Sequence, residues 1–176
     1  KSSFVLDIGA HFGTQTIIFS KLANFVWAFE PQMLLYFNLC ANLFINSCNN
    51  VKTLNVAVCH KNCITRLASE EKQSQKITYI NTRNNIIDYE KLQNTGGLSF
   101  EEIKNVDEIF DTDIAGVTID SFGFIEVNFI KIDAEHSDLF ILAGAVETIK
   151  KFKPIIIFEN FTENRSQINS KQKILM

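Results

Sequence analysis

The sequence predicts an α/β fold built on a mostly parallel, doubly wound sheet. Short apolar runs rich in β-branched and aromatic residues alternate along the chain with longer segments that suit helices. These runs are continuous rather than alternating in polarity, which is typical of strands covered on both faces. Acidic residues and glycines follow several of the runs, at the sheet edge where α/β proteins bind ligands.

The elements follow in a regular order. Strands are expected at Phe4–Ile8, Phe25–Phe29, residues 51–58, Phe129–Ile132 and Ile155–Phe158. Helices are expected at residues 13–23, 33–46 and 138–151. The last is the clearest, because Leu139, Leu142, Val146 and Ile149 recur at helical spacing and lysines gather at its C-terminal end. This order predicts Phe4–Ile8 at the centre of the sheet, flanked by Phe25–Phe29 and Phe129–Ile132.

The middle of the chain, residues 59 to about 124, is more polar and is expected to be an insert within the domain. We expect residues 64–68 and 76–80 to pair there as a hairpin. Asn94-Thr95-Gly96-Gly97 is typical of a turn or loop.

Length and composition indicate one globular domain over residues 1–176. The chain has 46% hydrophobic and 21% charged residues and a net charge of -3, so nothing points to a nucleic-acid partner. Its apolar runs are too short to span a membrane and no signal peptide is visible. Four cysteines are too few for a disulfide scaffold, which favours reduced thiols and a cytoplasmic location.

The two ends suggest a piece of a longer polypeptide. The chain starts at Lys1 and enters a strand almost at once, and it stops at the apolar triplet Ile174-Leu175-Met176. We therefore expect a sheet that is incomplete at both ends. Ile155–Phe158 should then form an exposed apolar edge.

The strongest motif is Val5-Leu6-Asp7-Ile8-Gly9-Ala10-His11-Phe12-Gly13, a buried strand that runs into a glycine-containing turn and a helix. Glycines let the backbone approach a ligand, and a helix N-terminus presents free N–H groups. The spacing is G-x-x-x-G and not the G-x-G-x-x-G of dinucleotide-binding folds, which disfavours an NAD-dependent oxidoreductase.

Two further acidic motifs end predicted strands. Glu30-Pro31 follows the second strand, where an acid commonly accepts hydrogen bonds from ribose hydroxyls. Asp133 and Glu135 follow Phe129–Ile132, and Glu159 follows Ile155–Phe158. Parallel strands bring these acids to one sheet edge, where paired carboxylates can orient a hydroxyl and take its proton.

As a set, these stretches resemble the FkbM family of S-adenosylmethionine-dependent methyltransferases. The resemblance also takes in Asn42 and Asn46 of the second helix, residues 55–58 and 118–122, Leu142-x-Gly144, and residues 154–159. It implies a Rossmann-like class I methyltransferase fold and methylation of an oxygen, often on a sugar or glycan-linked substrate.

The resemblance also implies roles for individual residues. Asp7, Gly9 and Gly13 match the loop that holds the methionine end of the cofactor, Glu30 matches the ribose acid, and residues 55–58 lie beside the adenine. The expected cofactor site comprises Asp7, Gly9, Ala10, His11, Gly13, Glu30, Pro31 and Ala57, with Asp133 and Glu135 as catalytic residues. The chain departs from the family pattern at His136, where a glycine is usual, and at Asp138, where a glutamate is usual.

We therefore expect an S-adenosylmethionine-dependent methyltransferase that acts on a hydroxyl of a small molecule or glycan. One alternative is a metal-assisted version in which Asp133, Glu159 and Asn160 bind Mg²⁺. Another is a non-catalytic nucleotide- or cofactor-binding module whose substrate side has decayed, an option that His136 keeps open. Cys59-His60-x-x-Cys63 has metal-type side chains but no fourth ligand at the usual spacing, so zinc is not expected.

Overall fold

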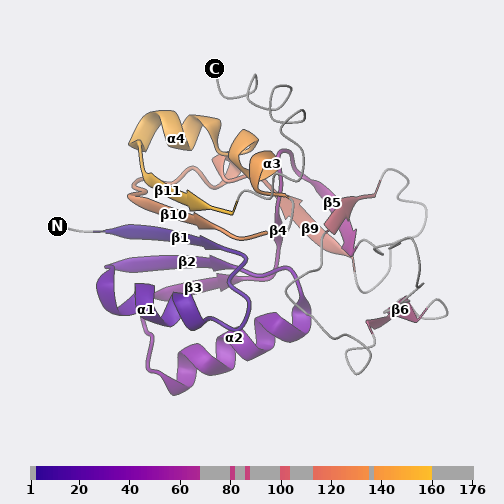
Figure 1. Cartoon of the computed structure of the whole chain (residues 1–176), viewed down its shortest axis with the longest axis horizontal. Helices are drawn as coiled ribbons and strands as arrows, with labels where there is room; N and C mark the ends of the chain where they lie inside the picture. The colour runs from indigo at the N-terminus through magenta and orange to yellow at the C-terminus, as the bar shows by residue number, and fades with distance from the viewer. Residues whose placement is uncertain are drawn as a thin grey trace.

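The computed structural model describes residues 3–67, 80–81, 86–87, 100–103, 113–134 and 137–159. Its main sheet has five parallel strands in the order β11-β10-β1-β2-β3 (Figure 1). The strands are β1 (Phe4–Ile8), β2 (Phe25–Phe29), β3 (Val51–Leu54), β10 (Phe129–Ile132) and β11 (Ile155–Phe158). The doubly wound parallel sheet predicted from the sequence is confirmed.

Strand β1 lies at the centre of this sheet, also as predicted. Leu6 is in register with Trp27 of β2 on one side and Ile130 of β10 on the other. Alternate residues of these strands face opposite sides of the sheet.

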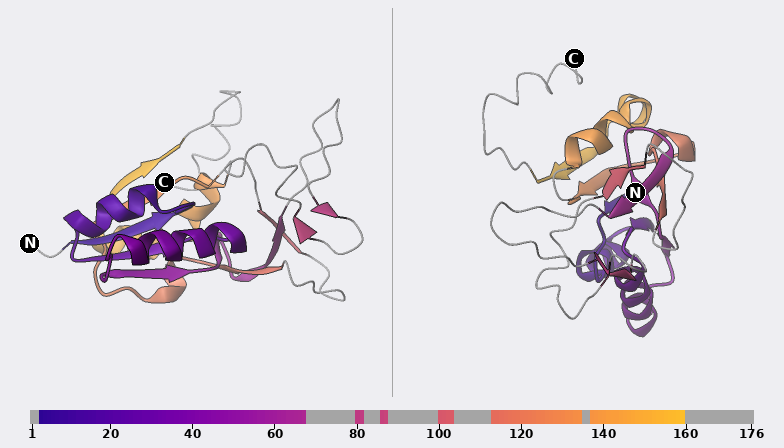
Figure 2. Two further views of the ribbon diagram at one scale, coloured as in Figure 1. Left: turned by 90° about the horizontal axis from the view of Figure 1, so that it is seen from below. Right: turned by 90° about the vertical axis from the view of Figure 1, so that its right-hand side faces the viewer.

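Helices cover both faces of the sheet. Helices α1 (Thr14–Leu22) and α2 (Met33–Ile45) lie on one face, and α3 (Asp138–Ala143) and α4 (Val146–Phe152) on the other (Figures 1 and 2). The larger core lies on the α3 and α4 side, where Leu6, Phe29 and Ile130 pack with the 3-10 helix η1 (Asp120–Phe122). Burial of these apolar side chains stabilises the fold by roughly 1.5–3 kcal/mol for each large residue.

The predicted strand over residues 51–58 is divided between two sheets, which corrects the sequence expectation. β3 ends at Leu54, and the side-chain amide of Asn55 donates to the carbonyls of Glu30 and Pro31 at 2.8 and 2.9 Å. These bonds turn the chain, so that β4 (Ala57–Val58) joins a second sheet instead.

This second sheet occupies part of the predicted insert and lies beyond the carboxyl ends of the main strands (Figure 1). Its order is β4-β9-β5-β8, with β5 (Cys63–Leu67), β8 (Phe100–Glu102) and β9 (Ile114–Val117). The hairpin expected between residues 64–68 and 76–80 lies mostly outside the described residues, which include only 64–67 and Ile80 of it. β5 pairs with β8 and β9, whereas β6 (Ile80–Asn81) pairs with β7 (Ile86–Ile87).

The predicted helix over residues 138–151 is two helices separated by Gly144 and Ala145. A Cβ on Gly144 would collide with the backbone oxygen of Cys59, so the chain passes close to the second sheet here. The glycine permits this contact, and α3 ends at it.

Strand β11 forms one edge of the main sheet, and three of its four apolar side chains are exposed as expected, whereas Ile156 packs against the core. Ile155, Ile157 and Phe158 keep 69%, 57% and 39% of their surface accessible. Within the part of the chain that the structure describes, no helix is both long enough and apolar enough to cross a membrane.

Candidate functional site

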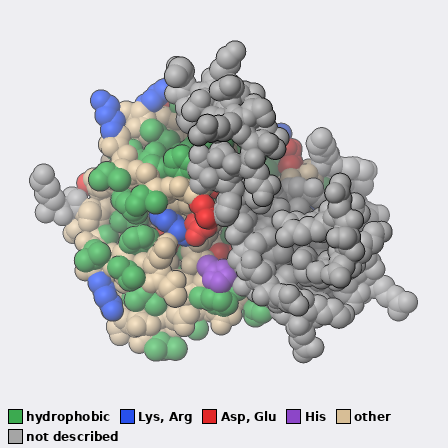
Figure 3. All heavy atoms as spheres, viewed as in Figure 1, with side chains coloured by type: hydrophobic (Ala, Val, Ile, Leu, Met, Phe, Trp, Pro, Cys, Tyr) green, Lys and Arg blue, Asp and Glu red, His purple; other side chains and the backbone are tan. Residues whose placement is uncertain are grey.

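A cavity of about 480 Å³ lies where the carboxyl ends of the main strands meet the second sheet. Six of the predicted cofactor residues line it: Gly9, Ala10, His11, Glu30, Pro31 and Ala57. Figure 3 shows acidic, basic and histidine side chains gathered over these strand ends, beside hydrophobic surface. Asp7 and Gly13 do not line the cavity. Asp7 lies within β1, and Gly13 directly precedes α1.

The loop between β1 and α1 has an unusual backbone. Gly9, His11 and Gly13 have φ angles of 74°, 52° and 83°, in the left-handed region that disfavours most side chains. A Cβ on Gly9 would collide with the backbone oxygen of Asp133, so this loop packs directly against the end of β10. The amides of Gly9 and Ala10 both donate to the Phe29 carbonyl at 3.0 Å, which ties the loop to β2.

Glu30 faces this loop from the end of β2. Its Oε2 accepts the backbone N–H of His11 at 2.8 Å, and its Oε1 accepts that of Gln32 at 2.9 Å. The residue is only 3% exposed. Burial raises the pKa of the Glu30 carboxyl to about 7, although the two backbone hydrogen bonds and the charge of Lys131 act in the opposite direction.

Behind the loop lies a buried charge cluster. The carboxylate of Asp7 is fully buried and accepts a hydrogen bond from the Thr16 hydroxyl at 2.6 Å. Lys131 Nζ forms ion pairs with Asp7 Oδ1 at 3.2 Å and with Asp133 Oδ2 at 3.5 Å, and it donates to the Gly9 carbonyl at 2.6 Å. The cluster fixes the loop relative to β1 and β10.

Asp133 is the predicted catalytic residue that the structure places in the cavity wall. Its side chain is 47% exposed, unlike that of Asp7, so it is accessible to a ligand. His11 lies in the same wall, where burial lowers the pKa of its imidazole, with a further decrease from Lys131 and an opposing effect from Asp133. Burial and Lys131 thus both favour the neutral form of the His11 ring.

Other predicted residues are not brought into the cavity. Glu159 is exposed at the end of β11 and does not contribute to the lining. Glu135, His136 and Asn160 lie outside the described residues. Asp138 is buried at the start of α3, where burial raises the pKa of its carboxyl. Among described side chains, no group of three His, Cys, Asp or Glu residues is arranged to hold a metal ion.

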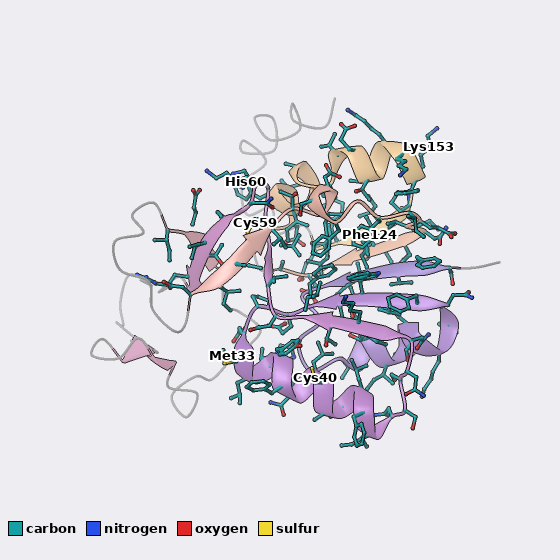
Figure 4. All side chains as sticks on the ribbon, turned by 180° about the vertical axis from the view of Figure 1, so that it is seen from behind. Met33, Cys40, Cys59, His60, Phe124 and Lys153 are labelled. Atoms are coloured by element: carbon teal, nitrogen blue, oxygen red, sulfur yellow. The ribbon has the colours of Figure 1, made fainter. Side chains whose placement is uncertain are left out.

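Further lining residues come from the second sheet and from the segment between β4 and β5: Cys59, His60, Cys63, Thr65 and Glu102. Cys59 and His60 lie where this sheet meets α3 (Figure 4). Burial, reinforced by the neighbouring Cys63 thiol, raises the pKa of Cys59 to about 12.

Sequence reasoning did not include Thr65 or Glu102 in the site. It gave Lys131 only as a cation that could pair with an acid, and the structure identifies those acids as Asp7 and Asp133. The positions of Thr65 and Glu102 depend on the pairing of β5 with β8 and β9, for which the sequence carries no local signal.

Comparison with known proteins agrees with this architecture. The model of the methyltransferase FkbM domain matches residues 7–176. A crystal structure of methyltransferase FkbM from Methylobacillus flagellatus KT is similar in fold, with a TM-score of 0.63 and 16% sequence identity. The match covers 99% of this chain and 37% of that one, so the chain spans little more than a third of its length. None of the curated proteins matches the chain in sequence.

Proposed function

Because the chain belongs to the FkbM methyltransferase family, we propose that it binds S-adenosylmethionine and promotes methyl transfer to a hydroxyl of a sugar or other small molecule. The observation that carries this proposal is the position of Glu30. Its buried carboxylate lies in the cavity wall at the end of β2, directly opposite the left-handed loop that follows β1.

The residues present fit the cofactor. Each oxygen of Glu30 accepts one backbone N–H and keeps a lone pair that can accept a ribose hydroxyl. Gly9 and Ala10 lie in the cavity wall without a bulky side chain, so the methionine end of the cofactor can approach the backbone there. Ala57 and its neighbours from residue 56 to 58 supply an apolar surface beside which an adenine ring can pack.

When bound, S-adenosylmethionine supplies a methyl group already activated on a sulfonium. The protein then has to hold an acceptor oxygen in line with that methyl group and remove its proton. Asp133 suits the second task, since its carboxylate lies in the wall and is half exposed. Lys131 pairs with Asp133 Oδ2 at 3.5 Å, and the 47% exposed side chain of Asp133 stays accessible to a hydroxyl.

Calorimetric titration with S-adenosylmethionine, S-adenosylhomocysteine and NAD tests the proposal. The wild-type chain should bind the first two and not NAD. Glu30→Ala should weaken binding by about 1–3 kcal/mol, because ribose hydroxyls lose a charged acceptor. Glu147→Ala is the matched control, since Glu147 is 75% exposed on α4 and should leave affinity unchanged. Binding of NAD alone, or equal affinity in the Glu30 variant, would contradict the assignment.

A further inference from the structure

Lys131 is a buried cation that contacts three separate segments of the site. Its side chain is 9% exposed. Nζ lies 2.6 Å from the carbonyl oxygen of Gly9, 3.2 Å from Asp7 Oδ1 and 3.5 Å from Asp133 Oδ2. These atoms belong to the loop after β1, to β1 itself and to the end of β10.

The sheet register explains how one side chain reaches all three. Asp7 and Lys131 are direct neighbours in the parallel pair of β1 and β10, so their side chains leave the same face of the sheet. Asp133 lies two residues beyond Lys131 and falls on that face as well. The long lysine stem then carries the ammonium past Asp7 to the strand end, where the Gly9 carbonyl lies.

A need for stability alone does not explain this arrangement. Replacement of a buried ion pair by apolar residues of similar volume is often neutral or stabilising, so Asp7 and Lys131 are a costly way to fill the space. An ammonium has three N–H donors and no acceptor, which lets it hold a carbonyl and two carboxylates at fixed separations. An apolar pair would fill the volume but would leave the Gly9 carbonyl and the Asp133 carboxylate without a common partner.

We propose that Lys131 is a positioning residue that sets the methionine-binding end of the site, by fixing the Gly9 carbonyl relative to Asp133. The proposal rests on the function proposed above. In this proposal the cavity has two halves, and a different residue holds each half in place. Lys131 supports the half formed by the loop after β1, whereas Glu30 supports the ribose half.

Two cofactor fragments separate the halves experimentally. S-Adenosylhomocysteine carries both the nucleoside and the amino-acid end, whereas 5′-methylthioadenosine carries only the nucleoside. The titrations are made at pH 9, above the Glu30 pKa of about 7, so that loss of the Lys131 charge does not also protonate Glu30. Lys131→Met should then lower affinity for S-adenosylhomocysteine about tenfold and leave affinity for methylthioadenosine unchanged, because only the former contacts the repositioned loop. Lys131→Arg, which keeps the charge and the donors, should lie closer to wild type. Glu30→Gln should weaken both ligands and serves as the comparison.

A second pair of variants controls for an effect of Lys131→Met on folding. Lys131→Met leaves the buried Asp7 carboxylate without a counter-charge, which can unfold the chain. Asp7→Asn combined with Lys131→Met removes both charges and is compared with Asp7→Asn alone. In that pair too, the loss should be confined to S-adenosylhomocysteine.

The outcomes distinguish this proposal from the function on which it rests. An equal loss of both ligands in a folded variant, or no loss of either, overturns the role of Lys131. A wild-type chain that binds neither ligand overturns the function itself.

Discussion

The carboxylate of Glu30 accepts the backbone N–H of His11 at 2.8 Å, across 19 residues of sequence. His11 is the non-glycine residue of the loop after β1 that adopts a left-handed conformation, with φ of 52°. The bond therefore links the proposed ribose acid to the backbone of the proposed methionine loop. Because an ionised carboxylate is a stronger acceptor than a protonated one, the charge of Glu30 affects both halves of the cavity.

Cofactor binding should depend on pH near neutrality. Burial, opposed by the Gln32 and His11 hydrogen bonds and by Lys131 but aided by Asp7, raises the pKa of Glu30 to about 7. If the ionised form binds ribose, affinity for S-adenosylhomocysteine should fall about tenfold between pH 8 and pH 6. Glu30→Gln should bind more weakly and lose most of this dependence. Equal calorimetric affinities at the two pH values in the wild type would contradict the prediction.

Stability should show the opposite trend in the absence of cofactor. The folded pKa of Glu30, about 7, lies above its ordinary value of 4.5, so the folded chain holds a proton that the unfolded chain has released between these values. The free energy of unfolding should therefore fall as pH rises from 4.5 to 7, by up to about 3 kcal/mol.

Urea unfolding followed by the fluorescence of Trp27, the single tryptophan, measures this effect. Its indole packs against the rings of Phe122 and Phe124 and so reports on the core. Glu30→Gln should remove the contribution of this group to the pH dependence, so that its free energy of unfolding changes less than that of the wild type between pH 4.5 and pH 7. A wild type and a variant with parallel pH profiles would show that Glu30 ionises at its ordinary pKa in the folded chain.

Continuous apolar runs predicted β1, β2 and β10 correctly because burial on both faces removes most polar positions from these strands. The boundary at Asn55 was not predictable from that pattern. Residues 51–58 read as one strand, and only the hydrogen bonds from Asn55 to the carbonyls of Glu30 and Pro31 turn the chain into a second sheet. The break at Gly144 also depends on a distant contact, the approach to the backbone of Cys59.

The candidate site was predictable where ligand-facing residues follow strands directly. Gly9, Glu30 and Asp133 all lie at strand ends, which parallel topology brings together. The role of Lys131 required the register of β1 and β10, which places it beside Asp7. Glu159 also ends a strand but does not line the cavity, because β11 lies at the sheet edge and one strand further from β1.

Gly9→Ala should destabilise the fold more than the same change at Gly123. Both glycines have positive φ, 74° and 59°, so both substitutions incur backbone strain of about 1 kcal/mol. At Gly123 the new methyl group meets no atom within 4 Å, whereas at Gly9 it collides with the Asp133 backbone. We expect a further loss of about 1–3 kcal/mol in the free energy of unfolding at Gly9, measured in urea. Equal losses would show that the end of β10 shifts away from the new methyl group with little loss of free energy of unfolding.

Cys59 should react slowly with alkylating agents. The thiolate is the reactive form, and burial together with the Cys63 thiol raises the pKa of Cys59 to about 12. At pH 8 the folded chain should therefore be modified by iodoacetamide at Cys59 far more slowly than the urea-unfolded chain, as followed by peptide mass spectrometry. Equal rates in the two states would contradict a raised pKa for this thiol.

Asp133→Asn should separate chemistry from cofactor binding. Asparagine keeps the size of the side chain but cannot take a proton from an acceptor hydroxyl. We expect methyl transfer to a sugar or other hydroxyl acceptor found by screening to fall by about 10²–10⁴-fold, measured as release of S-adenosylhomocysteine. Affinity for S-adenosylhomocysteine should stay within about threefold of wild type.

The same assay tests the metal-assisted alternative to proton removal by Asp133. Mechanisms that use Mg²⁺ need a cation to polarise the acceptor hydroxyl, so a chelator should abolish turnover and added Mg²⁺ should restore it. In the mechanism proposed here, Lys131 is the cation beside Asp133, and turnover should survive the chelator. Glu159→Gln provides the matched control, since Glu159 lies outside the cavity lining and its replacement should leave turnover unchanged unless it binds a metal. If the chelator abolishes turnover and Glu159→Gln also abolishes it, Asp133 acts as a metal ligand and not as the proton acceptor.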